Sequence, residues 1–156
     1  MTNLKTELIK WIDNTYKPKY LMTIQLPENL KSNNLEHSIN HLKSIMRDFE
    51  KFLLKRHWNK KHLPFIAFAE NGISKDWHFH LLLNGDNFSY IDLKIAIYRI
   101  ILKQKIPTYC IQLDKIEDGI AKVESYTIKE IKITDFNKFD SDRMILSQDL
   151  FNIEKK

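Results

Sequence analysis

The sequence predicts an α+β domain in which helices pack on one face of an antiparallel sheet. At least four short apolar segments with strand character are spread along the chain, and segments with helical periodicity stand between them. At 156 residues, 43% of them hydrophobic, the chain has room for one domain with a real core, with or without a tail. The order of the strands in the sheet is not specified by these patterns.

The first elements are a helix and a strand. Four apolar residues at helical spacing predict an amphipathic helix over residues 3–15, ended by the break at Pro18: Leu4, Leu8, Trp11 and Ile12. Residues 19–26 (KYLMTIQL) then read as a strand closed by Pro27.

The longest periodic segment predicts a helix over about residues 33–57. It carries one apolar stripe: Leu35, Ile39, Leu42, Ile45, Met46, Phe49, Phe52 and Leu53. A basic loop with an aromatic side chain follows at residues 57–62 (HWNKKH), and most of the excess positive charge of the chain lies between His41 and Leu63.

Two apolar strands are predicted next, at residues 64–69 (PFIAFA) and 77–83 (WHFHLLL). Asn71 and Gly72 lie among the turn residues between them, so the two strands are expected to pair as a hairpin.

The remaining chain predicts a helix, a strand and a third helix. The helix covers residues 91–102 and is entered through Ser89 or Asp92, and the strand covers residues 108–113. A third helix is expected over residues 116–129, and polar residues dominate from Thr134 onward, as in a tail.

Composition excludes several classes of protein. Three glycines in the whole chain leave no glycine-rich phosphate loop, so the chain carries no NTPase of its own. The single Cys110 forms no internal disulfide, and no signal peptide or run of eighteen apolar residues occurs, which favours a cytoplasmic protein without membrane contact. A net charge of +5 suits a polyanionic partner.

His78 and His80 are candidate metal ligands. Two apart in a strand, they leave the same face, while their neighbours point to the other. Glu70, at the end of the neighbouring strand, could supply a third ligand to a site with open positions. The alternative is that the histidines are solvent-side or satisfied residues and Glu70 is a charge beside a turn.

Tyr126 and Lys129 are candidate catalytic residues. At i and i+3 of the expected third helix they share a face, where a lysine or a metal-bound phosphate could stabilise the phenolate of a nucleophilic tyrosine. The alternative is a helix tyrosine with its ring on the core, and Tyr109 is a weaker candidate because no lysine follows it one turn on.

Taken in order, the strand YLMTIQL, the strand WHFHLLL and the segment SYTIKE resemble the HUH endonucleases, in particular the rolling-circle replication initiators (Rep) with one catalytic tyrosine. The resemblance covers about residues 19–131. It implies a five-stranded antiparallel sheet related to the RNA-recognition-motif fold, a Mg²⁺ or Mn²⁺ site at Glu70, His78 and His80, and nicking and joining of single-stranded or hairpin DNA through a 5′-phosphotyrosine on Tyr126, with Lys129 assisting.

The resemblance divides the chain into a helical extension (residues 1–18), the endonuclease domain (19–133) and a tail (134–156). Such initiators often carry a helicase domain, which is not recognised here, so a separate helicase is an expected partner; a homodimer is also left open. Single-tyrosine transposases and plasmid relaxases of the same superfamily are alternatives. So is a noncatalytic single-stranded nucleic-acid-binding module on the same kind of sheet.

The basic loop supplies the expected DNA contacts, with an aromatic ring for stacking on an unpaired base. The residues are Lys55, Arg56, Trp58, Lys60 and Lys61. The alternative is a solvated helix face, the usual position of lysines on a long helix. A metallo-β-lactamase type of hydrolase is disfavoured because leucines follow His80 where that class needs Asp and His.

Overall fold

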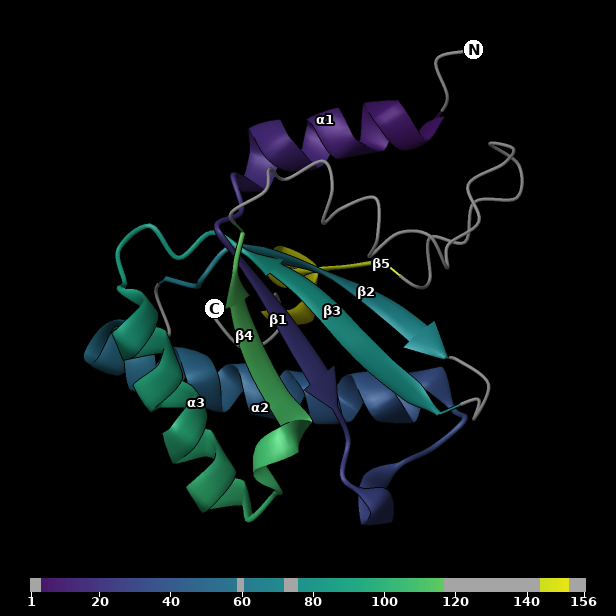
Figure 1. Cartoon of the computed structure of the whole chain (residues 1–156), viewed down its shortest axis with the longest axis vertical. Coiled ribbons are helices and arrows are strands. Elements are labelled where there is room, and N and C mark those ends of the chain that lie inside the picture. The colour runs from purple at the N-terminus through teal and green to yellow at the C-terminus, as the bar shows by residue number, and fades with distance from the viewer. Residues whose placement is uncertain (1–3, 59–60, 72–75, 117–143, 152–156) are drawn as a thin grey trace.

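A five-stranded antiparallel sheet forms the centre of the molecule in the computed structural model (Figure 1). The order of the strands is β4-β1-β3-β2-β5. Their bounds are β1 (Tyr20–Gln25), β2 (Phe65–Asn71), β3 (Trp77–Leu83), β4 (Ile111–Lys115) and β5 (Met144–Leu146). The α+β class is confirmed, and the open sheet with helices is consistent with an HUH or RNA-recognition-motif type of fold.

The structure describes residues 4–58, 61–71, 76–116 and 144–151. The helices in these ranges are α1 (Leu4–Tyr16), α2 (Leu35–Leu54), α3 (Tyr90–Gln104) and the short α5 (Ser147–Phe151). The third helix expected over residues 116–129 lies outside the described residues. Within the described residues, no helix combines the length and the apolar character that a membrane span needs.

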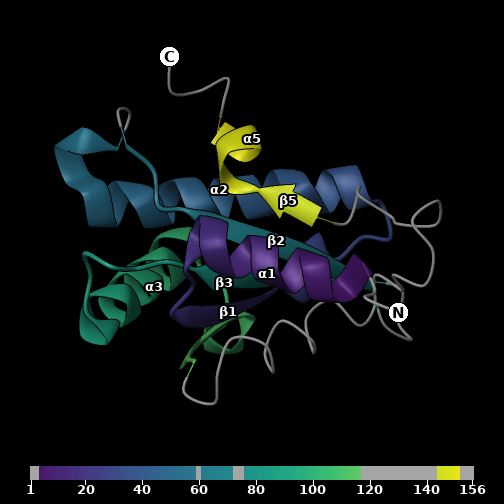
Figure 2. The same ribbon diagram turned by 90° about the horizontal axis from the view of Figure 1, so that it is seen from above.

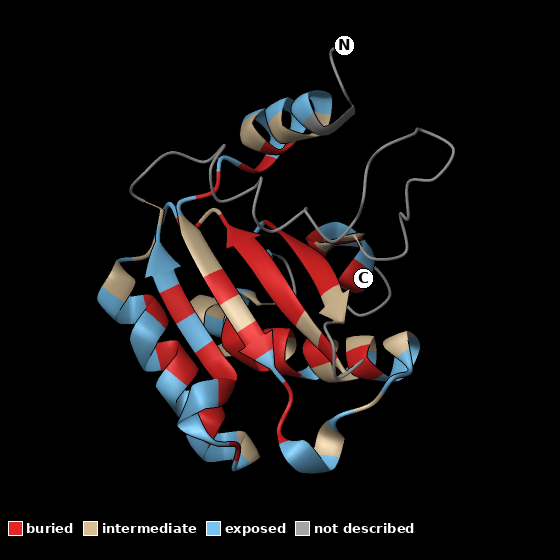
Figure 3. Cartoon of the chain, turned by 45° about the vertical axis from the view of Figure 1, so that its right-hand side comes forward, coloured by how far each residue is buried: buried red, intermediate tan, exposed pale blue. Residues whose placement is uncertain are grey.

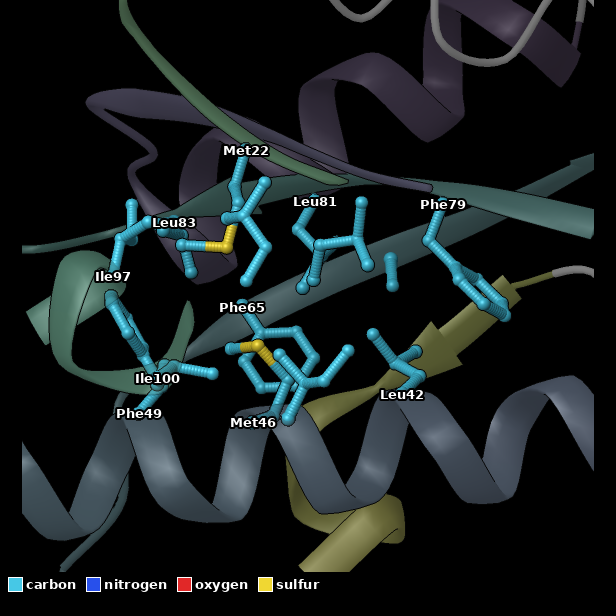
Figure 4. Packing of buried hydrophobic residues seen from close by; sticks show 14 of the residues in the cluster. Met22, Leu42, Met46, Phe49, Phe65, Phe79, Leu81, Leu83, Ile97 and Ile100 are labelled. Atoms are coloured by element: carbon cyan, nitrogen blue, oxygen red, sulfur yellow. The ribbon is translucent and has the colours of Figure 1, made fainter. Parts of the chain in front are cut away.

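One face of the sheet forms the main core with α2 and α3. Side chains alternate along a strand, so Phe79 and Leu81 of β3 point to this face together with Met22 of β1 and Phe65 of β2. Figure 4 shows them meeting Met46 and other side chains of α2. The two central strands are buried over most of their length (Figure 3).

The opposite face of the sheet is covered in part by α1 (Figure 2). Ile12 and Tyr16 pack there on Ile66, Phe68 and Leu82. The N-terminal helix expected as an extension therefore packs on the sheet. Because α1 covers the end of this face near Leu82, the other end, where β3 begins, carries side chains that α1 does not bury in this cluster.

Helices α2 and α3 begin with side-chain caps, as expected from their sequences. Asn34 accepts a hydrogen bond from the backbone of His37, and Ser89 and Asp92 form a reciprocal capping box. Both residues suggested as the entry to α3 thus act together. Helix α2 ends at Leu54, three residues earlier than predicted, and passes into a 3-10 turn over Lys55–His57.

The strand predicted at residues 108–113 is wrong at its start. Residues Thr108–Cys110 form a 3-10 turn after Pro107, closed by a hydrogen bond from the backbone N–H of Cys110 to the Pro107 carbonyl. The extended segment begins only at Ile111, where pairing with Ile24 of β1 starts, and continues to Lys115. The apolar pattern therefore located the strand, and the proline turn shifted its beginning.

The last described segment belongs to the sheet, although the sequence suggested a tail. Strand β5 pairs antiparallel with β2, with Ile145 opposite Ala67. The hydroxyl of Ser147, at the start of α5, accepts a hydrogen bond of 3.1 Å from the backbone N–H of Phe65. Residues 144–151 thus cover the edge of β2.

Candidate metal centre

Glu70, His78 and His80 meet on the sheet face that carries α1. Glu70 of β2 is directly opposite His78 in the antiparallel pairing with β3, and His80 follows two residues later on the same face. The hairpin expected from the sequence is confirmed. Its register brings the three predicted ligands to adjacent positions at the end of the two strands.

The three side chains converge through their polar atoms. Glu70 Oε2 lies 2.8 Å from His80 Nε2 and 3.5 Å from His78 Nε2, and the ligand atoms of all three residues lie within 4.8 Å of one another. The side chains are 15%, 10% and 24% exposed for Glu70, His80 and His78, so the cluster is partly shielded but reachable from solvent.

This arrangement fits a small divalent cation. Ligand atoms about 2.1 Å from a metal lie roughly 3.0–3.4 Å apart at octahedral or tetrahedral angles, close to the two distances from Glu70 Oε2. Two imidazoles and one carboxylate form a set that leaves coordination positions open for water or a phosphate oxygen. The cluster could therefore bind a divalent metal ion.

Thr23 supports the ring of His80 from the neighbouring strand. It is the cross-strand partner of His80 in β1, and its Oγ1 lies 3.5 Å from His80 Nδ1. With Nε2 directed to the Glu70 side, Nδ1 is the ring nitrogen left to donate to a hydroxyl oxygen. Sequence reasoning did not single out Thr23, and only the register of β1 against β3 could have identified it.

The surface around the cluster is polar. On the same face, Gln25 of β1 and Gln112 and Asp114 of β4 are exposed, while their strand neighbours Ile24 and Leu113 are buried. Two strands on one side of the cluster therefore present hydrogen-bonding side chains to solvent. A polar ligand laid across this face could reach the cluster.

The expected DNA-binding residues lie at the other end of the sheet. Lys55, Arg56, Trp58 and Lys61 belong to the segment between α2 and the start of β2, whereas Glu70 is near the end of β2 (Figure 1). Five strand residues span about 17 Å. The structure therefore does not bring these residues to the metal ligands; Tyr126, Lys129 and Lys60 are outside the described residues.

Trp58 is already in contact with a cation. The Nζ of Lys51, one turn from the end of α2, lies 4.5 Å from the centre of its ring, and the side chain is half-buried. One ring face is thus occupied by Lys51. The stacking surface expected from the sequence is reduced accordingly.

Residues 10–133 match the model of one protein family, described as replication-associated protein of the ORF2 type. No curated protein and no solved structure gives a match. The matched range contains every ligand of the cluster as well as Tyr126 and Lys129.

Proposed function

The chain belongs to this family of replication-associated proteins, and from that premise we propose that it is a rolling-circle initiator that nicks and rejoins single-stranded DNA in a metal-dependent reaction. Tyr126 is the proposed nucleophile and Lys129 its partner. Glu70, His78 and His80 are the proposed metal ligands.

The observation that carries this proposal is the convergence of one carboxylate and two imidazoles at the open end of a sheet face. A structural histidine pair would need no acidic partner aimed between the two rings. Glu70 Oε2 instead approaches both Nε2 atoms, at 2.8 Å and 3.5 Å. The family match makes DNA the substrate class that this site would take.

In the proposed first step, the phenolate oxygen of Tyr126 attacks the scissile phosphorus in line. A bond forms between that oxygen and phosphorus while the bond from phosphorus to the 3′ oxygen breaks. The 3′ oxygen leaves with the electron pair and takes up a proton, giving a free 3′-hydroxyl. The DNA downstream of the nick stays on Tyr126 as a 5′-phosphotyrosine, and attack by a 3′-hydroxyl reverses the step.

A bound divalent cation would supply Lewis acidity at the non-bridging phosphate oxygens. Glu70, His78 and His80 would hold it, and Thr23 would keep the His80 ring oriented with Nε2 toward the site. Lys129 would stabilise the phenolate of Tyr126. The exposed Gln25 and Gln112 would contact the DNA strand on the same face.

The test is a covalent capture experiment with the full chain, Mn²⁺ and single-stranded hairpin DNA from the protein's own genetic neighbourhood. The oligonucleotides carry one label upstream and another downstream of each candidate nick. The proposal predicts a denaturant-resistant adduct that carries only the downstream label, and an upstream product whose 3′-hydroxyl a polymerase extends. Both are lost in Tyr126→Phe and with EDTA.

Tyr109→Phe is the matched control, since Tyr109 is an exposed tyrosine remote from the proposed mechanism. It should retain the adduct. Tight DNA binding that EDTA does not change, with no adduct on any oligonucleotide, would favour the noncatalytic binding module instead. An adduct that persists in Tyr126→Phe would assign the nucleophile to another residue.

The single-tyrosine transposase or relaxase reading shares this chemistry and differs in the DNA joined. A separate helicase is proposed as a partner, because strand separation needs a motor for which the sequence has no phosphate loop.

A further inference from the structure

Helix α3 exposes a narrow apolar stripe that its own fold leaves uncovered. Ile91, Ile95, Tyr98 and Leu102 are 67%, 50%, 59% and 62% exposed, and they are four of the six large hydrophobic residues that are exposed among the described residues. We call these four residues the α3 stripe.

The α3 stripe lies opposite the buried side of the helix. At 100° per residue, its four members fall within about 60° of one another, and the buried Leu93, Ile97 and Ile100 lie on the far side. The spacing of four, three and four residues is that of alternating d and a positions in a coiled-coil seam. Exposed side chains on α3 are also evident in Figure 3.

The exposed area is large for a lone helix. The four side chains present roughly 400–500 Å² to solvent, which is the size of the largest apolar patch on a typical monomer. Two such patches facing each other approach the roughly 1,200 Å² total of a small specific interface, before flanking residues are added. Ile95 also lines a groove with Phe52 and Phe88, which extends the apolar surface beyond the helix.

The charges beside the stripe point to the orientation of a partner helix. Asp92 and Arg99 flank it on one side, at e positions, and Lys94 flanks it on the other, at a g position. In an antiparallel pair of α3 helices, the e positions face each other, so Asp92 meets the partner copy's Arg99 twice by symmetry. In a parallel pair, Lys94 would face the partner copy's Arg99, which is repulsive.

We propose that the α3 stripe is the interface of a twofold-symmetric dimer of this chain, with the two α3 helices antiparallel and Ile95 of each copy packed on Tyr98 of the other. Helix α3 packs on the sheet face opposite to the metal cluster. The dimer therefore leaves both clusters open to solvent. This inference does not depend on the proposed nicking activity.

The first experiment is sedimentation equilibrium of the full chain from about 1 to 100 µM. The weight-average mass should rise from 18.7 kDa toward twice that value. Ile95→Lys should keep the circular dichroism spectrum and raise the dimer dissociation constant at least about 100-fold, because each copy would bury an ammonium group in the seam. Tyr109→Lys, at another exposed aromatic residue, is the matched control and should dimerise like the unmodified chain.

The second experiment tests the orientation with cysteines. Ile95→Cys mixed with Tyr98→Cys should form an intermolecular disulfide on mild oxidation, whereas either variant alone should form little. In a parallel pair, Ile95→Cys alone would crosslink to itself. Arg99→Asp, which places like charges opposite each other, should weaken the dimer roughly tenfold.

A chain that stays at 18.7 kDa up to 100 µM overturns the proposal. So does a dimer that Ile95→Lys leaves intact, since its interface would lie elsewhere. Strong crosslinking of Ile95→Cys alone would overturn the antiparallel arrangement.

Discussion

Glu70 and His78 are direct cross-strand partners, and the carboxylate oxygen of one lies 3.5 Å from the Nε2 atom of the other. Opposite residues in an antiparallel pair are the closest neighbours that two strands can offer. The cluster is therefore built on hydrogen-bonded backbone, and its geometry depends on the β2–β3 register rather than on a loop.

Replacement of Glu70 by glutamine should weaken Mn²⁺ binding at least about 100-fold, because the site loses its only negative ligand and keeps two neutral imidazoles. Titration calorimetry or the electron paramagnetic resonance signal of free Mn²⁺ would measure it. Glu28→Gln, at an exposed residue paired with Lys31, is the control and should bind as before. Unchanged affinity in Glu70→Gln would remove the carboxylate from the site.

Thr23→Val should lower metal affinity about tenfold without unfolding the protein, because valine keeps the shape and loses the oxygen near His80 Nδ1. Thr23→Ser restores a hydroxyl and should recover most of the affinity. The comparison of the two variants separates ring orientation from packing. Equal losses in both would mean that the methyl group, not the oxygen, is what His80 requires.

Asp48 ties α2 to α3 and should make stability depend on pH. Its carboxylate accepts hydrogen bonds of 2.7 Å from Lys103 and 2.8 Å from Gln104. Burial alone would raise the pKa of Asp48, but the hydrogen bonds from Lys103 and Gln104 outweigh it and hold the pKa below its ordinary value of 3.8.

A carboxyl whose pKa is lowered by folding stabilises the protein above the unfolded-state pKa, and the contribution is lost as pH falls through the folded-state pKa. Asp48→Asn should therefore reduce the free energy of unfolding by about 1–2 kcal/mol at pH 7, since the exposed Lys103 is partly screened. The difference should shrink toward roughly pH 2–3. Urea unfolding of both proteins at the two pH values checks this, and a pH-independent difference would contradict it.

Two backbone positions with positive φ should respond in opposite directions to substitution. Gly85 has φ +64°, and an added Cβ would lie 2.7 Å from a ring carbon of Tyr20. Gly85→Ala should therefore destabilise the protein by about 2 kcal/mol. Lys105 ends α3 in the left-handed region with φ 54°, where Lys105→Gly should stabilise it by about 1 kcal/mol. Urea unfolding of both variants measures the two effects; a gain in stability in Gly85→Ala would argue against the crowding by Tyr20.

Local patterns were enough to predict the hairpin and its ligands. The alternation in WHFHLLL put both histidines on one face, and the short connection to the preceding strand placed Glu70 near them. These are contacts between neighbours in the sequence, where spacing and turn residues determine the geometry.

Contacts between distant segments were not predictable in the same way. Strand β5 has three residues and follows a polar stretch, so no periodicity marks it. The approach of Thr23 to His80 depends on a pairing across 57 positions, which local spacing does not encode. The α3 stripe was also hidden, because a helix with apolar residues on two sides looks in sequence like any apolar helix.

The edge contact made by residues 144–151 has a consequence for synthesis of the protein. Phe65 must wait for Ser147, 82 positions later, before its backbone N–H finds its partner. Until then the nascent chain exposes the outer edge of β2, a hydrophobic strand open to pairing with other chains. Closure of the sheet is thus a late event on the ribosome, and chaperone capture of unfinished chains would occur at this edge.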